Sequence, residues 1–274
     1  IDEGGAIIPA KIKGLLDINI AGVGIAEKGY ADFEISVSAK GGHSSQPPNH
    51  TALGEMANII KDIENHQFKA KLTPYIKELF IRIGKQMTYP GRIFTCNLWL
   101  LWPVVKAVMK RIPAAASMIR TTTAVTMASG SPAPNVLPQT AKIVANFRIM
   151  PGSSVKDVEK HLIKVIKNKN VNIRLIESKE PSAISPTDSE AFKAIEDIFY
   201  RMNNKNLVAP YLVMGGTDAC RYEGVAKNIY RLSPFVFSTD LLLTTHGTNE
   251  RLPIDCVEDG VAFFKRYIRR LAGE

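Results

Sequence analysis

The segment best suited to chemistry is Thr245 to Pro253, a polar stretch with one histidine, His246, beside a glycine. A strand-like apolar stretch, residues 229–235, precedes it. Apolar residues at helical spacing follow it, and we interpret them as the core-facing side of a helix: Val257, Val261, Phe264, Ile268 and Leu271. His246 is therefore expected in a loop between packed elements, where a scaffold can aim a ligand or a base. An ordinary surface histidine is the alternative.

A second candidate is the acidic pair Asp2-Glu3, which lies in a turn bounded by glycines. Carboxylate oxygens bind divalent metals, and a neutral imidazole such as that of His246 does the same through nitrogen. If the pair and the histidine meet in space, their mixed oxygen and nitrogen ligands suit zinc. A solvated acidic turn is the alternative.

Three further positions could contact a substrate. His43 lies in a loop of glycines and serines, which exposes its imidazole, although a hydrogen-bonded loop histidine is equally expected. Arg148 alternates with two apolar neighbours, so its guanidinium should leave the sheet core and could clamp a carboxylate; a surface arginine is the alternative. Gly216-Thr217 offers unhindered backbone N–H groups to an anion, or is simply a turn.

Composition limits the function classes. The 274 residues carry a formal charge of +9, but no basic stripe is interleaved with aromatic residues, which argues against nucleic-acid binding. The three cysteines lie far apart and match neither a disulfide framework nor a metal motif, which favours a reducing, cytoplasmic compartment. The most apolar run, residues 98–105, is much shorter than the ~20 residues of a membrane-spanning helix. We interpret it as a buried or pocket-lining segment.

The apolar pattern between residues 29 and 180 predicts strand–helix–strand–strand–helix–strand, a ferredoxin-like arrangement. Residues 66–118 interrupt this pattern and read as an insertion of short helices. Residues 1–28 are irregular in pattern, whereas residues 181–274 show a helix from Asp188 to Met202, strands near 212–214 and 229–232, and a final helix. The two outer stretches are therefore expected to form another domain, into which the ferredoxin-like domain is inserted.

Several motifs occur together in a fixed order: Asp2-Glu3-Gly4-Gly5, Gly42-His43-Ser44-Ser45-Gln46-Pro47-Pro48, Arg120-Thr121-Thr122-Thr123, Asn135-Val136-Leu137-Pro138, Asn146-Phe147-Arg148-Ile149 with Pro151-Gly152, Gly215-Gly216-Thr217-Asp218 and His246-Gly247-Thr248-Asn249-Glu250. Over essentially its whole length the chain resembles the zinc exopeptidase family that contains aminoacylase, carboxypeptidase S and succinyl-diaminopimelate desuccinylase. It is most similar to the branch of carboxypeptidase S and the N-fatty-acyl-amino-acid hydrolases.

The resemblance implies an α/β fold made of two parts. Residues 1–28 and 181–274 would be the C-terminal portion of a di-zinc exopeptidase catalytic domain. Residues 29–180 would be an inserted ferredoxin-like (α+β) lid that forms a homodimer and carries a helical insertion at about 66–118. The implied reaction is hydrolysis of the amide bond of a dipeptide or an N-acyl amino acid by zinc-activated water. The apolar insertion suggests a pocket for a hydrophobic acyl chain, or an ordinary packed extension.

The resemblance also implies roles for single residues. His246 would bind one zinc ion, and Glu3, with Asp2 as its rival, would bind the other. On the substrate side, His43 would stabilise the oxyanion, reaching the partner subunit's active site. The residues that would contact the substrate carbonyl or carboxylate are Asn135, Arg148, Gly216, Thr217 and, as an assisting residue, Arg221.

The chain departs from the family pattern in one respect. The early His-x-Asp ligands, the bridging aspartate and the Glu-Glu pair of base and ligand do not occur, and no two glutamates are adjacent. Because the chain also begins without Met, we expect a C-terminal fragment that lacks about a domain of sequence and is inactive alone. A non-catalytic dimerisation or binding module left from such an enzyme is the alternative. Neither reading includes nucleic acid or a membrane span in this chain.

Overall fold

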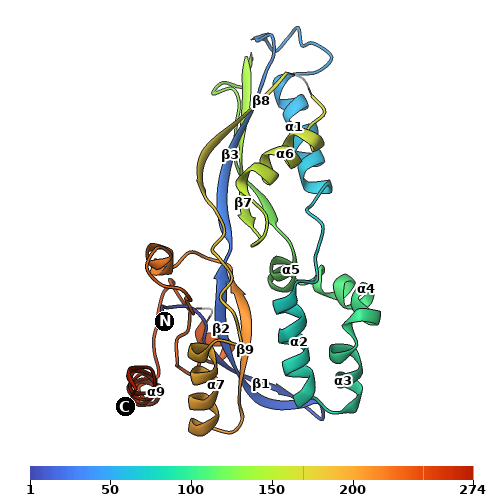
Figure 1. The fold of residues 1–274 in the computed structure, drawn as a ribbon. Coiled ribbons are helices and arrows are strands. Elements are labelled where there is room, and N and C mark those ends of the chain that lie inside the picture. Colours follow the sequence, from blue (N-terminus) through green and yellow to red (C-terminus); the bar gives the residue numbers. More distant parts are fainter. Residues whose placement is uncertain (169, 243, 274) are drawn as a thin grey trace. The chain divides into compact units, whose positions relative to one another are not determined.

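A computed structural model gives the fold and describes residues 1–168, 170–242 and 244–273. The chain divides into two compact units, which are described separately (Figure 1). Unit 1 comprises Ile1–Glu27, Lys71–Ile119 and Ser182–Glu274. Unit 2 comprises Lys28–Ala70 and Arg120–Pro181.

Unit 2 has the ferredoxin-like arrangement that the sequence predicts. Its elements in chain order are β3 (Gly29–Ser38), β4 (Gly42–His43), α1 (Ala52–Asn65), β5 (Thr122–Ser129), β6 (Val136–Leu137), β7 (Thr140–Ile149), α6 (Val155–Val165) and β8 (Val171–Lys179). The main sheet has the order β5-β7-β3-β8 with every neighbouring pair antiparallel. The two helices α1 and α6 pack on this sheet and on each other. The strand–helix alternation was therefore a reliable signal.

Alternating side chains form the core of unit 2. Phe33, Ile35 and Val37 of β3 are buried, as are Phe147 and Ile149 of β7. Burial of each large apolar side chain contributes about 1.5–3 kcal/mol. Because successive residues point to opposite faces of a strand, this face fixes the direction of the polar residues between them. Register and burial together thus determine where the polar face of β7 lies.

Unit 1 contains a three-stranded sheet of order β1-β2-β9. Strands β1 (Ile7–Ile12) and β2 (Leu16–Glu27) form an antiparallel hairpin, and β9 (Asn206–Val213) pairs with β2 in parallel. The expectation of irregular structure for residues 1–28 is therefore wrong. The C-terminal half of β2 is almost entirely buried, so it shows no alternation of polar and apolar residues. A strand of this kind lacks the pattern that identifies half-buried strands.

The helical segment consists of α2 (Pro74–Gln86), α3 (Tyr89–Cys96), α4 (Leu98–Met109) and α5 (Pro113–Ile119). We expected it to belong to the ferredoxin-like domain, but it groups with unit 1. The physical reason is that α2 packs against β9. Arg82 of α2 also forms an ion pair with Glu196 of α7 (Glu190–Met202) and donates to the Val208 carbonyl at 3.3 Å. No helix in the described part of the chain is long and apolar enough to cross a membrane.

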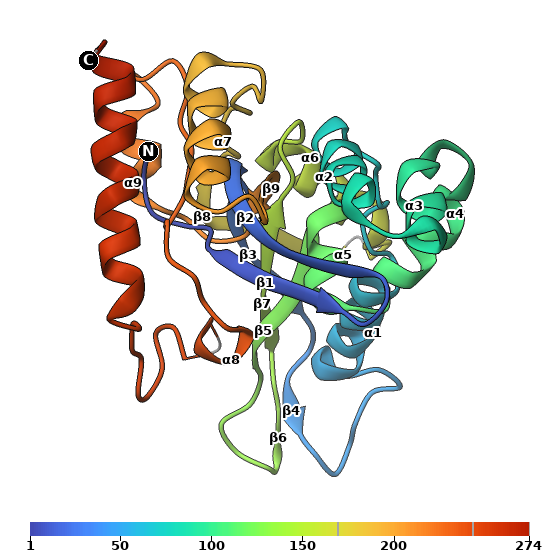
Figure 2. The same cartoon turned by 90° about the horizontal axis from the view of Figure 1, so that it is seen from below.

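The last helix, α9 (Asp255–Ala272), lies beside α7 in both ribbon views (Figures 1 and 2). The predicted core-facing side is wrong, because Val257, Val261, Phe264, Ile268 and Leu271 are exposed. The helix instead buries a second stripe, Cys256, Gly260, Phe263 and Tyr267. A Cβ on Gly260 would lie 2.4 Å from Phe235, so glycine permits this close packing. Both stripes have helical spacing, and sequence alone does not rank them.

Smaller elements complete unit 1. They are η1 (Asp218–Tyr222) and α8 (Thr239–Leu242). Residues 229–232 do not form the expected strand but make bridges at Arg231, to Asp2 and to Gly24. Helix α7 starts later than expected, with Ser189 as its N-cap, because the Ser189 hydroxyl accepts a hydrogen bond from the Phe192 N–H at 3.0 Å.

Candidate functional site

A cavity of about 980 Å³ lies in unit 1, and several of the predicted site residues line it. Its polar lining includes Glu3, Thr217, His246 and Glu250. Its apolar lining comes from the hairpin, the helical segment and the last third of the chain: Ile8, Ile20, Leu79, Ile83, Met118, Phe235, Phe237, Leu241, Leu242 and Leu252. A few polar groups in an apolar cavity of this size are typical of small-molecule sites.

Glu3 reaches this cavity from a turn that only glycine can form. Gly4 and Gly5 have φ angles of 110° and 67°, in the left-handed region. A Cβ on Gly5 would lie 2.3 Å from the Gly22 carbonyl oxygen, so the turn sits directly on β2. Asp2 is held differently: its N–H donates to the Tyr230 carbonyl at 2.9 Å, and its Oδ2 is buried without a hydrogen-bond partner. Of the acidic pair, Glu3 is the residue that lines the cavity.

His246 lies in a tight loop with unusual backbone geometry. Its φ is 60°, in the left-handed region, and its backbone N–H donates to the Glu250 carboxylate at 3.0 Å. Such a φ at a residue other than glycine costs energy and concentrates at functional sites. The loop thus presents an exposed imidazole to the same cavity as Glu3. Glu250, which the sequence analysis did not single out, both fixes this loop and lines the cavity.

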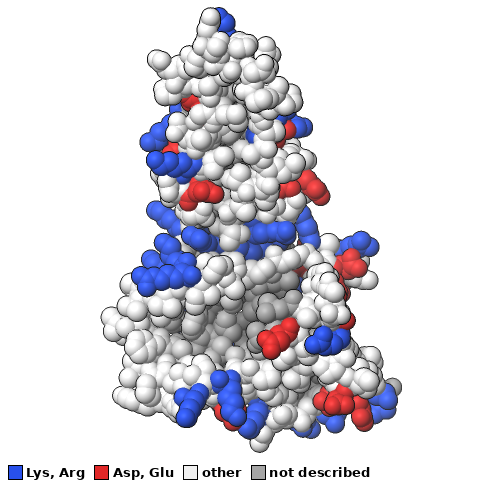
Figure 3. Space-filling view, turned by 180° about the vertical axis from the view of Figure 1, so that it is seen from behind, with Lys and Arg blue, Asp and Glu red and all other residues white. Residues whose placement is uncertain are grey.

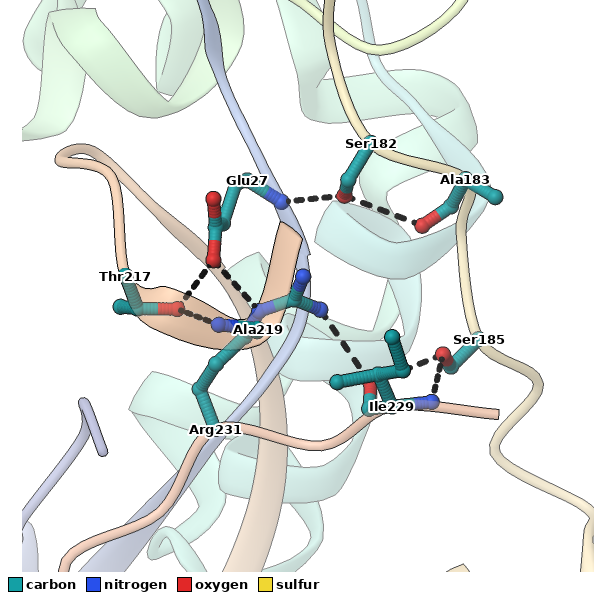
Figure 4. A network of polar contacts seen from close by, with 8 residues as sticks. All are labelled: Glu27, Ser182, Ala183, Ser185, Thr217, Ala219, Ile229 and Arg231. Carbon is teal, nitrogen blue, oxygen red and sulfur yellow. Dashed lines mark hydrogen bonds and ion pairs between the residues drawn. The ribbon is translucent and has the colours of Figure 1, made fainter. Parts of the chain in front are cut away.

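The Gly216-Thr217 turn also lines the cavity, and a buried network holds it (Figure 4). The Thr217 hydroxyl donates to the carboxylate of Glu27, which also accepts a hydrogen bond from Arg231 Nε at 2.9 Å. Glu27 and Arg231 are 0% and 1% exposed. The Glu27 N–H in turn donates to the Ser182 hydroxyl at 2.7 Å. Glu27 and Arg231 were not predicted from the sequence; the available signal was a carboxylate at the end of an apolar stretch.

Tyr211 of β9 is another cavity-lining residue that sequence analysis missed. Burial raises the pKa of its phenol to about 12, against an opposing hydrogen bond with the Gly5 backbone and the charge of Arg231. The phenol therefore remains protonated at neutral pH and is available as a hydrogen-bond donor or acceptor. Arg221, by contrast, lies on η1 with 77% of its side chain exposed, 3.5 Å from the Asp218 carboxylate.

Unit 2 brings His43 and Asn135 together. The short strands β4 and β6 pair His43 with Val136, and a groove of about 480 Å³ is lined by both His43 and Asn135. His43 Nδ1 lies 2.8 Å from the Ser45 hydroxyl and accepts a hydrogen bond from the Ser45 N–H at 3.2 Å. With Nδ1 engaged in this way, Nε2 is the ring nitrogen that remains for a substrate.

Arg148 leaves the core of unit 2, as expected, and its guanidinium lies over the Tyr30 ring, 4.8 Å from the centroid. Lys28 is buried nearby, and its Nζ donates to the Arg120 carbonyl at 2.9 Å. Burial, together with the charges of Arg148 and Arg120, lowers the pKa of Lys28 to about 7. The charges of Arg148 and Arg120 thus both act on Lys28, and a cluster of basic side chains of this kind suits an anionic group.

The low pKa of Lys28 predicts a pH dependence of stability. The folded chain releases this proton near pH 7, whereas the unfolded chain keeps it to about 10.5. Stability relative to a Lys28→Met variant should therefore rise by about 1.4 kcal/mol per pH unit between pH 7 and 10. Urea unfolding of both proteins at pH 7, 8 and 9 measures this difference. The exposed Lys40→Met variant is the control, and a pH-independent difference for Lys28→Met would contradict the prediction.

The metal site can be tested against the residues present. Glu3 and His246 line one cavity and have suitable ligand chemistry. Within the described residues, however, no group of three or more His, Cys, Asp or Glu side chains could hold a metal ion. The described part of the chain therefore supplies two candidate ligands and not a complete set.

Comparison with known proteins defines the class. The fold matches that of a metallo-carboxypeptidase of the M20 family from Sulfolobus solfataricus, Sso-CP2, with a TM-score of 0.59 at 16% identity over 97% of this chain and 62% of that one. Human carnosine dipeptidase 1 matches with a TM-score of 0.57 at 14% identity, over 94% of this chain and 58% of that one. The two-unit α/β fold is therefore that of the M20 peptidases.

The family follows from the sequence match. The peptidase dimerisation domain of the M20 family matches residues 25–174, and the chain belongs to this family. A probable carboxypeptidase S-like protein of Dictyostelium discoideum is 34% identical over 270 residues, 98% of this chain and 52% of its own length. The N-fatty-acyl-amino acid synthase/hydrolase PM20D1 of Xenopus tropicalis is 29% identical over 98% of this chain and 53% of its own length. The chain spans about half the length of these relatives.

Proposed function

We propose that the protein is a metal-dependent hydrolase that cleaves the amide bond of a dipeptide or an N-acyl amino acid. The observation that carries this proposal is the unit 1 cavity, which combines Glu3, His246 and the Gly216-Thr217 turn with apolar walls. The relatives include proteins named as carboxypeptidase S and as an N-fatty-acyl-amino acid synthase/hydrolase. Zinc is the metal that the glutamate and histidine chemistry favours.

The residues of this chain would bind and orient the substrate. Backbone N–H groups at Gly216-Thr217 suit the carboxylate of the amino-acid part, and Tyr211 offers a phenol in the same cavity. His43 and Asn135 would hold the scissile carbonyl, with His43 donating to the developing oxyanion. Arg148 would pair with a substrate carboxylate. A metal, when bound, would lower the pKa of a water molecule and polarise the carbonyl.

Two further parts of the proposal concern assembly. We propose that unit 2 forms a homodimer, because the family model that matches it is named for dimerisation. We also propose that the 274-residue chain alone is inactive, because its described residues supply an incomplete metal site. Light scattering and a hydrolysis assay on the purified chain test these two points. The alternative is a non-catalytic dimerisation module. It predicts that no form of the protein contains bound metal.

The apolar walls make the acyl group the testable part of the substrate. Leu79, Ile83 and Met118 come from the helical segment and line the cavity, whereas Leu98 is buried and Trp99 is exposed. Residues 98–105 therefore do not line this cavity. Helix α2 and the end of α5 form the wall instead. We propose that this wall accepts a hydrophobic acyl chain or side chain.

An Ile83→Trp variant should fill this part of the cavity. In the protein as its gene encodes it, we expect kcat/KM for a long-chain N-acyl amino acid to fall at least tenfold, roughly the effect of ~1.4 kcal/mol of lost binding. The N-acetyl substrate should change by less than about twofold. Ile163→Trp, on the exposed surface of α6, is the matched control. Equal losses for both chain lengths would contradict an acyl pocket at this wall.

A further inference from the structure

Helices α3 and α4 expose an unusual number of large apolar side chains. Trp99 is 76% exposed and Tyr89 is 77% exposed, and neighbouring aliphatic and aromatic residues are also accessible. We call this the α3–α4 surface, formed by Tyr89, Ile93, Phe94, Trp99, Leu100, Val104, Val108 and Ile112. Single exposed apolar residues are ordinary, but a contiguous set on adjoining helices marks an interaction site.

Helix α4 is apolar on its accessible side as well as on its buried side. The residues it buries are Leu98 and Met109. Its accessible side carries Leu100, Val104 and Val108 at a spacing of four residues, and Ile112 continues the row in the following turn. The apolar stripe therefore faces outward, and burial within the chain does not explain it.

The charged residues of the helical segment that follow Glu78 are all basic. Residues 79–119 contain no acidic residue, yet they contain six Lys and Arg side chains. Arg92 is exposed in the middle of α3, and Lys110 and Arg111 are exposed directly after α4. In Figure 3 the left-hand side of unit 1, where these helices lie, is largely white with blue at its margin. The partner that complements both features is apolar and anionic.

We propose that the α3–α4 surface inserts into the interface of an anionic lipid bilayer, with Trp99 and Leu100 in the acyl boundary and Arg92, Lys110 and Arg111 at the headgroups. Tryptophan and tyrosine favour the interfacial region, and basic side chains beside an apolar helix face bind anionic lipid. The helices lie on the membrane and do not span it, which agrees with their length and with the absence of a spanning helix among the described residues. This proposal is independent of the hydrolase activity.

Vesicle flotation tests it with the full chain. The wild type should float with phosphatidylcholine vesicles that contain about 30% phosphatidylserine, and much less with phosphatidylcholine alone. The double variant Trp99→Ser/Leu100→Ser should lower the partition coefficient at least tenfold, roughly the effect of losing two interfacial apolar anchors. Lys110→Glu/Arg111→Glu should lower it by a similar factor, since each basic side chain contributes about fivefold.

The matched control is Val261→Ser/Ile268→Ser on α9, because these residues are 50% and 63% exposed but lie outside the α3–α4 surface. It should float as the wild type does. A Trp102→Phe protein keeps Trp99 as its single tryptophan, and its emission should shift to the blue on addition of anionic vesicles.

Three results would overturn the proposal. They are no flotation of the wild type, flotation of the Trp99→Ser/Leu100→Ser variant at the wild-type level, and an unchanged Trp99 emission. If that variant instead changed only the oligomeric state measured by light scattering, the surface would be a protein interface. Circular dichroism of each variant confirms folding, so a loss of binding cannot be assigned to unfolding.

Discussion

Replacement of His246 by glycine should remove hydrolytic activity while leaving the chain folded. Because His246 has a φ of 60°, glycine relieves backbone strain at this position as it removes the imidazole. Loss of residues that merely support a metal ligand costs about 10–100-fold, so loss of His246, the proposed ligand, should lower kcat/KM by more than about 100-fold. Glu3→Gln should have an effect of similar size.

The measurement uses the protein as its gene encodes it and records the zinc content per chain beside the rate. About two zinc ions are expected in the active protein, with fewer in either variant. Thr248→Ala, an exposed change in the same loop, should alter neither quantity. Full metal and activity in His246→Gly would show that His246 is a loop residue only, and no zinc in any form would favour the dimerisation module.

Replacement of Arg231 by methionine should destabilise unit 1 by about 3–5 kcal/mol, because it leaves the buried Glu27 carboxylate without its guanidinium partner. The pair is 0% and 1% exposed, so water cannot replace the lost hydrogen bond. Chemical denaturation of the wild type and the variant measures the difference in the free energy of unfolding.

The control for this change is Arg201→Met, which breaks the exposed ion pair between Arg201 and Asp197 on α7. It should cost less than about 1 kcal/mol. A double variant, Glu27→Leu/Arg231→Met, should recover part of the loss, because it removes both buried charges. If Arg231→Met cost no more than Arg201→Met, the buried pair would contribute little to folding.

The Glu27 network also has a consequence for the candidate site. Thr217 donates to the same carboxylate that Arg231 holds, so the cavity-lining turn depends on two charges that do not line the cavity themselves. Glu27 and Arg231 are therefore positioning residues for the proposed carboxylate-binding turn. The two residues lie 204 positions apart in the sequence, and no local sequence pattern predicts a contact over that separation.

Local patterns predicted the elements whose exposure alternates. Strands β3 and β7 each have one buried face, so apolar and polar residues alternate along their sequences. This alternation predicted the ferredoxin-like arrangement correctly. Strand β2 is buried on both faces over its second half and was missed. The placement of the helical segment was missed for another reason: the packing of α2 on β9 joins residues far apart in sequence.

The candidate site divides in the same way. Glu3, His246 and the Gly216-Thr217 turn were identified from residue type and from glycine neighbours, and the structure brings them to one cavity. His43 and Asn135 likewise share a groove. Tyr211 and Glu250 were not identified, because a tyrosine in a strand and a glutamate in a polar loop have many ordinary explanations. Their relevance depends on a cavity that exists only after folding.

The outward stripe of α9 affects how this chain behaves in solution. An exposed row of apolar side chains runs along the otherwise charged helix α9: Val257, Val261, Phe264, Ile268 and Leu271. These side chains are 36–63% exposed, so much of their apolar surface stays in contact with water. This exposed apolar row lowers the solubility of the folded protein. At high concentration or in strongly salting-out buffers, the rows on separate molecules attract one another, and the folded chains associate before any unfolding begins.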